Sequence, residues 1–181
     1  MRDAWEVDRG ARAKLRGVAV AVPLLEALDA IDPEAAIAEI VRQLEESFHM
    51  YARRLASRSA QPITEIRFYW AGAEIEPWVP SVVMGNVYAG RTLLLDSCGG
   101  FDPTPLEILC NALADTPELG EDDALGDLEQ LFVTTSLELA ARAIAIAARG
   151  APFAALSTAR PVDFVATPGH DTRNELLLRL E

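Results

Sequence analysis

The chain has 181 residues, half of them hydrophobic and 24% charged, which excludes an intrinsically disordered protein and makes a single globular domain the expected organisation. Its longest uncharged apolar run, residues 17–25, is nine residues long, whereas a membrane-spanning helix needs about 20. This run lies too far from Met1, behind charged residues, for a standard signal peptide. Two cysteines twelve positions apart are too few for a secreted disulfide framework. We therefore expect a soluble cytoplasmic protein with reduced thiols.

The net charge of −12 is concentrated in the middle of the chain. Residues 92–141 contain eleven acidic residues and no Lys or Arg, whereas the first 91 residues carry 13 acids against 11 bases. Such a surface disfavours nucleic acids and anionic membranes as partners, and favours either a basic protein partner or simple solubility. All basic residues except Lys14 are arginine, a bias typical of a GC-rich bacterial genome.

The N-terminal part of the chain is predicted to be mostly helical, with one short strand. Residues 1–16 are polar and mixed in charge, and are expected to form a loosely held arm or a short helix. The next apolar stretch begins with β-branched residues that predict a strand, after which Pro23 opens a short helix. Asp32 is then a good N-cap and Pro33 fits the first helical position. Apolar residues recurring at steps of three and four predict a long amphipathic helix over 33–57.

Several strands are predicted next. Residues 63–71 alternate between two faces and predict a strand. The segment around Trp78 is expected to return as an edge strand, because its two prolines exclude a central position. Further short strands are predicted at 82–84, 87–89 and 92–96, separated by glycines. The last is apolar throughout, so we expect it to be buried on both faces.

Two capping-box patterns predict helices that begin at Thr104 and Thr135. Residues 133–135 are poor helix formers, so we expect a break there rather than a continuous helix from the preceding leucines. Gly150 is expected to close the second helix.

The C-terminal residues predict a return to the sheet. Residues 162–167 read as a strand, and 174–181 either pair with it as a hairpin or form a last helical turn. The order of helix, strands, helices and final strand predicts an α+β fold. We expect a single domain with a mostly antiparallel sheet and helices packed on one face.

One set of residues suggests covalent catalysis. Cys98 ends an apolar strand before two glycines, where hydrolases often carry a nucleophile, and His170 could act as its base beside Asp171. However, the G-x-S-x-G pattern is absent, and a lone cysteine beside an apolar strand is commonly a buried hydrophobe. The sequence Pro168-Gly169 also explains this segment as a type II turn. No metal-ligand spacing or nucleotide motif is present, so we expect no metal or cofactor.

The favoured hypothesis is a non-enzymatic, acidic protein-binding domain of the immunity or antitoxin type, which neutralises a basic partner. The residues expected to bind the partner are an exposed tryptophan and seven acids of the middle segment: Trp78, Asp115, Glu118, Glu121, Asp122, Asp123, Asp127 and Glu129. The alternative is a cysteine-dependent hydrolase or transferase that uses Cys98 and His170. A third hypothesis is a structural subunit whose acidic helices pack on another chain, and the sequence indicates no oligomeric state.

Overall fold

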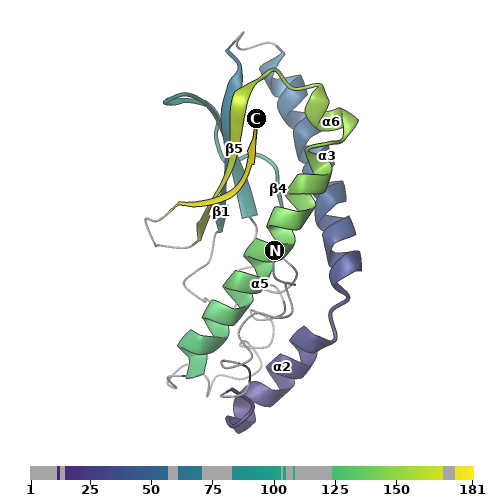
Figure 1. Cartoon of the computed structure of the whole chain (residues 1–181), viewed down its shortest axis with the longest axis vertical. Helices are drawn as coiled ribbons and strands as arrows, with labels where there is room; N and C mark the ends of the chain where they lie inside the picture. The colour runs from purple at the N-terminus through teal and green to yellow at the C-terminus, as the bar shows by residue number, and fades with distance from the viewer. Residues whose placement is uncertain are drawn as a thin grey trace.

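The computed structural model describes residues 12, 15–56, 61–70, 83–102, 104, 108, 124–168 and 174–181. Its elements in chain order are η2 (Ala19–Ala21), α2 (Val22–Asp29), α3 (Pro33–Leu55), β1 (Ile63–Trp70), β2 (Val83–Ala89), β3 (Thr92–Leu95), β4 (Gly100–Phe101), α5 (Ala124–Ala147), α6 (Ala151–Ala154), β5 (Thr158–Pro168) and β6 (Glu175–Leu180). Figure 1 shows their course along the chain.

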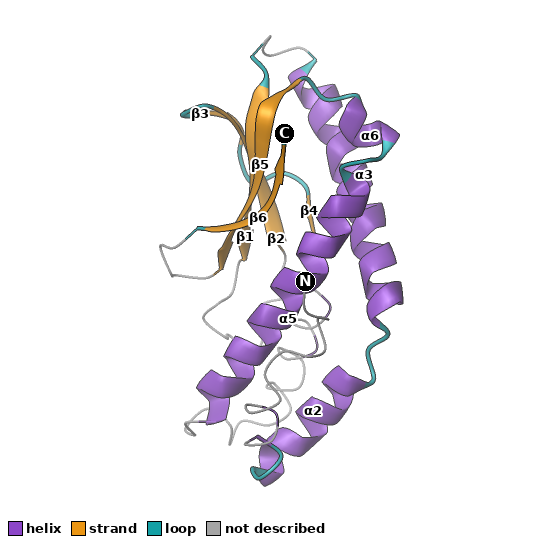
Figure 2. Ribbon diagram, viewed as in Figure 1, coloured by secondary structure: helices purple, strands orange, loops and turns teal. Residues whose placement is uncertain are grey.

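The six strands of the described residues form one mixed sheet. Its order is β3-β2-β1-β5-β6, and β4 pairs with β2 on the edge that also holds β3. Among the described strands only β1 and β5 run parallel, and the other pairs are antiparallel. The described helices lie on one side of this sheet (Figure 2). The predicted α+β fold, with a mostly antiparallel sheet and helices on one face, is confirmed.

Helix α3 is the element that the sequence predicts best. The Asp32 carboxylate accepts hydrogen bonds from the backbone N–H groups of Glu34 and Ala35 at 2.9 and 3.3 Å, so it caps the helix as expected. The helix ends at Leu55, two residues before the predicted end. Its apolar stripe is buried against the sheet and against α5 and α6: Ile37, Ile40, Leu44, Phe48 and Tyr51.

Three phenylalanines join α3, α6 and β5 in the core. The ring centroid of Phe48 lies 5.2 Å from that of Phe153 and 6.4 Å from that of Phe164, and the last two are 5.5 Å apart. All three pairs are inclined rather than stacked face to face, which is the arrangement that the ring quadrupole favours. This cluster packs α3 and α6 against β5.

The predicted break before Thr135 is wrong, because α5 is continuous from Ala124 to Ala147. Thr135 is fully buried, and its hydroxyl donates a hydrogen bond of 2.8 Å to the Leu131 carbonyl one turn earlier. A threonine satisfied in this way is tolerated inside a helix. Packing of α5 against α3 then outweighs its weak local propensity. Gly150, expected to close this helix, is the N-cap of α6 instead.

The strands predicted at 82–84 and 87–89 are one strand, β2, which continues through Gly85 and Asn86. A Cβ atom on Gly85 would lie 2.1 Å from the Tyr51 hydroxyl, so this glycine makes room for a core side chain rather than a turn. The strand predicted at 92–96 exists as β3, but it is an edge strand whose Thr92 is exposed. The expectation that it is buried on both faces is therefore wrong.

The N-terminal stretch also differs from its prediction. The stretch expected to form a strand contains the 3-10 turn η2 instead, while the short helix with Pro23 in its first turn is confirmed as α2. Of residues 1–16, expected to form a loosely held arm or a short helix, Arg12 and Leu15 are helical and buried. Residues 1–11 lie outside the described residues.

At the C-terminus, β5 and β6 form an antiparallel hairpin in which Phe164 is opposite Leu178, which confirms the hairpin alternative. Trp78 lies outside the described residues. Of the helix predicted from Thr104, the structure describes only Thr104 and Ile108, both helical. No helix in the described part of the chain has the length and apolarity needed to cross a bilayer.

Candidate functional site

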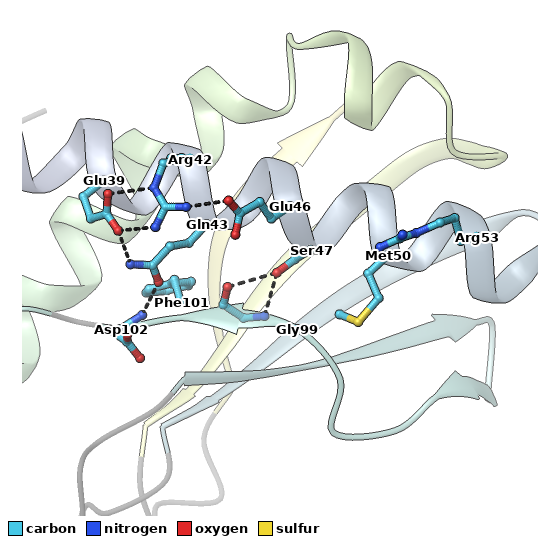
Figure 3. A pocket seen from close by; sticks show the side chains of 11 residues that line it. Glu39, Arg42, Gln43, Glu46, Ser47, Met50, Arg53, Gly99, Phe101 and Asp102 are labelled. Carbon is cyan, nitrogen blue, oxygen red and sulfur yellow. Dashed lines mark hydrogen bonds and ion pairs between the residues drawn. The ribbon is translucent and has the colours of Figure 1, made fainter.

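A surface groove of about 560 Å³ separates α3 from the end of the sheet edge at β4 (Figure 3). The helix lines it with one apolar side chain, Met50, and with charged and polar ones: Glu39, Arg42, Gln43, Glu46, Ser47 and Arg53. The strand side is made by residues 99–102, which lie about fifty residues further along the chain. The groove therefore exists only in the folded protein.

Two side chains of α3 hold the strand side in place. The Ser47 hydroxyl accepts a hydrogen bond from the Gly100 N–H at 2.9 Å and donates one to the Gly100 carbonyl at 3.0 Å. One turn earlier, the Gln43 side-chain oxygen accepts the Asp102 N–H at 2.7 Å. These contacts replace the partner strand that an edge strand lacks, so α3 covers this part of the edge.

The glycine pair before β4 makes this close approach possible. Gly99 has a φ of +66°, and a Cβ atom there would lie 2.8 Å from the Ser47 hydroxyl oxygen. Gly100 has a φ of +127°, and a Cβ atom there would lie 1.7 Å from the Val83 carbonyl oxygen. Both the backbone conformation and the available space therefore require glycine at these positions.

The charges of the groove are unevenly placed along it. Arg42 lies between Glu39 and Glu46 and is bonded to both carboxylates (Figure 3). Hydrogen bonds from Arg42, and then from Gln43, lower the pKa of Glu39 to about 2. Exposed Asp102 directly follows β4 on the facing side, and Arg53 is at the other end of the groove. The end of the groove opposite Arg53 thus has three carboxylates, two of which are paired with Arg42.

The structure places few of the acids that the sequence singled out. Asp115, Glu118, Glu121, Asp122 and Asp123 lie outside the described residues, as does Trp78. Asp127 and Glu129 belong to α5, but their side chains are not among those described. No pair among these predicted binding residues is therefore brought together in the described structure.

Two acids of the same base-free window, Asp96 and Asp102, are described and exposed, and Asp102 lines the groove. Its neighbours Glu39 and Glu46 are not predicted as site residues from the sequence, because they have the pattern of ordinary polar residues outside the apolar stripe of α3. Their spacing of seven places them on one helix face two turns apart, with Arg42 between them. That spacing is the signal by which they could be found.

Cys98 is enclosed rather than presented at the surface. Its exposed fraction is 5%, and its N–H donates to the Gly85 carbonyl at 3.0 Å. The nearby Tyr51 side chain is fully buried, and this burial, with a smaller effect of Cys98, raises the Tyr51 pKa. His170 lies outside the described residues. Within the described residues, no group of three His, Cys, Asp or Glu side chains could hold a metal ion.

The opposite face of the sheet, which no described helix covers, has a polar and aromatic cluster on β1 and β2. The Arg67 guanidinium carbon lies 5.1 Å from the centre of the Tyr88 ring, and Arg67 is paired with Glu65 at 2.6 Å. The hydroxyl groups of Tyr69 and Tyr88 are 3.3 Å apart. The charge of Arg67 is thus matched within the cluster.

Comparison with family models, with curated proteins and with solved structures finds no match. The class of the protein therefore rests on its fold and groove alone: an acidic α+β domain with a charged groove between a long helix and a sheet edge.

Proposed function

We propose that this chain is a non-catalytic protein-binding domain that recognises a basic partner protein, in the manner of an immunity protein or antitoxin. The observation that carries the proposal is the placement of charge. A window of fifty residues has eleven acids and no base, and one of its described acids, Asp102, lies exposed across the groove from Glu39 and Glu46. One acid of this window thus lines the same groove as two acids and two arginines of α3.

This arrangement suits a basic segment of a partner. Lysine and arginine side chains make charge-assisted hydrogen bonds with exposed carboxylates, and the acidic surface around them raises the association rate of a cationic protein. Because the pKa of Glu39 is about 2, its carboxylate stays charged at any physiological pH. This low pKa reflects the pairing of Glu39 with Arg42, so the charge of this carboxylate is already matched by a cation within the chain.

The cysteine-dependent alternative has weaker support. A catalytic thiolate must reach its substrate, and reactive cysteines lie in partly exposed, electropositive surroundings. Cys98 is instead 5% exposed, and the segment around it belongs to the acidic part of the chain. We therefore retain the binding function as the proposal and test the thiol separately.

The proposal is tested by reversing charges in the groove. The probes are the basic proteins encoded by reading frames next to this one in its source genome, and binding is measured by surface plasmon resonance. We expect the double variant E46K/D102K to associate with its partner at least about tenfold more slowly than the unchanged protein. The variant D122K/D123K/D127K tests the acidic segment in the same way.

The matched control is E175K, because Glu175 is exposed on β6 at the edge of the sheet opposite β4. Its charge change per residue is the same, but its position is remote from the groove. If E175K slows association per charge as much as the groove variant does, the groove is not the binding site. If none of the neighbouring basic proteins binds, the proposed function itself is wrong.

A further inference from the structure

We draw no further inference here: the strongest candidate, the side-chain cluster of Arg67, Tyr69 and Tyr88 on the sheet face that no described helix covers, carries none because nothing in the structure shows what covers it.

Discussion

Single residues determine how closely α3 approaches the sheet edge, and Gly100 is the most restrictive of them. Its φ of +127° disfavours any side chain, and a Cβ atom there would lie only 1.7 Å from the Val83 carbonyl oxygen. We expect Gly100→Ala to destabilise the fold by about 4 kcal/mol or more, from backbone strain and overpacking together. Urea unfolding followed by circular dichroism measures this loss.

Gly90 provides the matched control for that substitution. It also has a positive φ, +58°, but nothing lies within 4 Å of the position that a Cβ atom would take. Gly90→Ala should therefore cost only the left-handed backbone strain, about 1–2 kcal/mol. Equal losses in the two variants would show that the space at Gly100 does not matter, and that β4 can move away from Val83 without cost.

The thiol of Cys98 gives a second test at this scale. In a Cys110→Ser background only Cys98 can react. Because the thiol is 5% exposed, we expect iodoacetamide to label the native protein at least about tenfold more slowly than the urea-unfolded protein, since reaction requires local opening. Fast native labelling with an apparent pKa well below about 8.5 would contradict the non-catalytic proposal and favour the cysteine-dependent one.

At the scale of elements, Ser47 joins α3 to β4 through two hydrogen bonds. Replacing Ser47 by alanine removes both hydrogen bonds to Gly100. The Gly100 N–H and carbonyl groups then lack the hydroxyl as a partner. We expect a loss of about 1–3 kcal/mol in the free energy of unfolding. Ser157→Ala, at an exposed loop position before β5, is the control and should change stability by less than about 0.5 kcal/mol.

The Ser47→Ala variant also tests whether this contact protects the sheet edge from aggregation, in addition to stabilising the fold. If the hydrogen bonds protect the edge of the sheet, Ser47→Ala should aggregate faster than Ser157→Ala at equal protein concentration. Light scattering at a temperature below unfolding measures this. A variant with full stability and no added aggregation would show that β4 needs no partner from α3.

The sequence predicts elements whose signals are local. The cap formed by Asp32 and Pro33 and the spacing of apolar residues define α3, and alternation defines β1. By contrast, the capping-box pattern at Thr135 is the same whether the residue begins a helix or is buried inside one. Only the packing of α5 against α3 decides the outcome. Likewise, hydrophobicity alone does not show that β3 lies at an edge, because that depends on strand order.

The groove is a property of the whole molecule, and this limits what the sequence reveals. Its two sides come from residues 39–53 and 99–102, joined by the hydrogen bonds of Ser47 across 53 positions in the chain. The acidic excess and its location can be predicted from the sequence, because charge is additive along the chain. The placement of Glu39 and Glu46 across the groove from Asp102 cannot be predicted from the sequence, because it depends on the strand order of the sheet and on the packing of α3.

The net charge of −12 makes a prediction for the molecule as a whole. If long-range attraction guides a basic partner to the acidic surface, the association rate should fall by on the order of tenfold or more between low and physiological ionic strength, while the dissociation rate changes much less. Stopped-flow mixing with a basic protein that binds in the surface plasmon resonance assay measures both rates. The decrease of the association rate with rising ionic strength should be shallower for E46K/D102K than for the unchanged protein, because two attractive charges become repulsive at the groove.

The control E175K carries a smaller change in net charge, and this change lies at a remote edge of the sheet. The salt dependence of its association rate should therefore stay close to that of the unchanged protein. Exposed charges separated by more than about 8 Å at physiological salt are largely screened, which is why position matters more than net charge there. An association rate that does not depend on salt would contradict electrostatic recognition. It would leave apolar contacts as the source of binding and remove the reason for assigning the acidic groove to the interface.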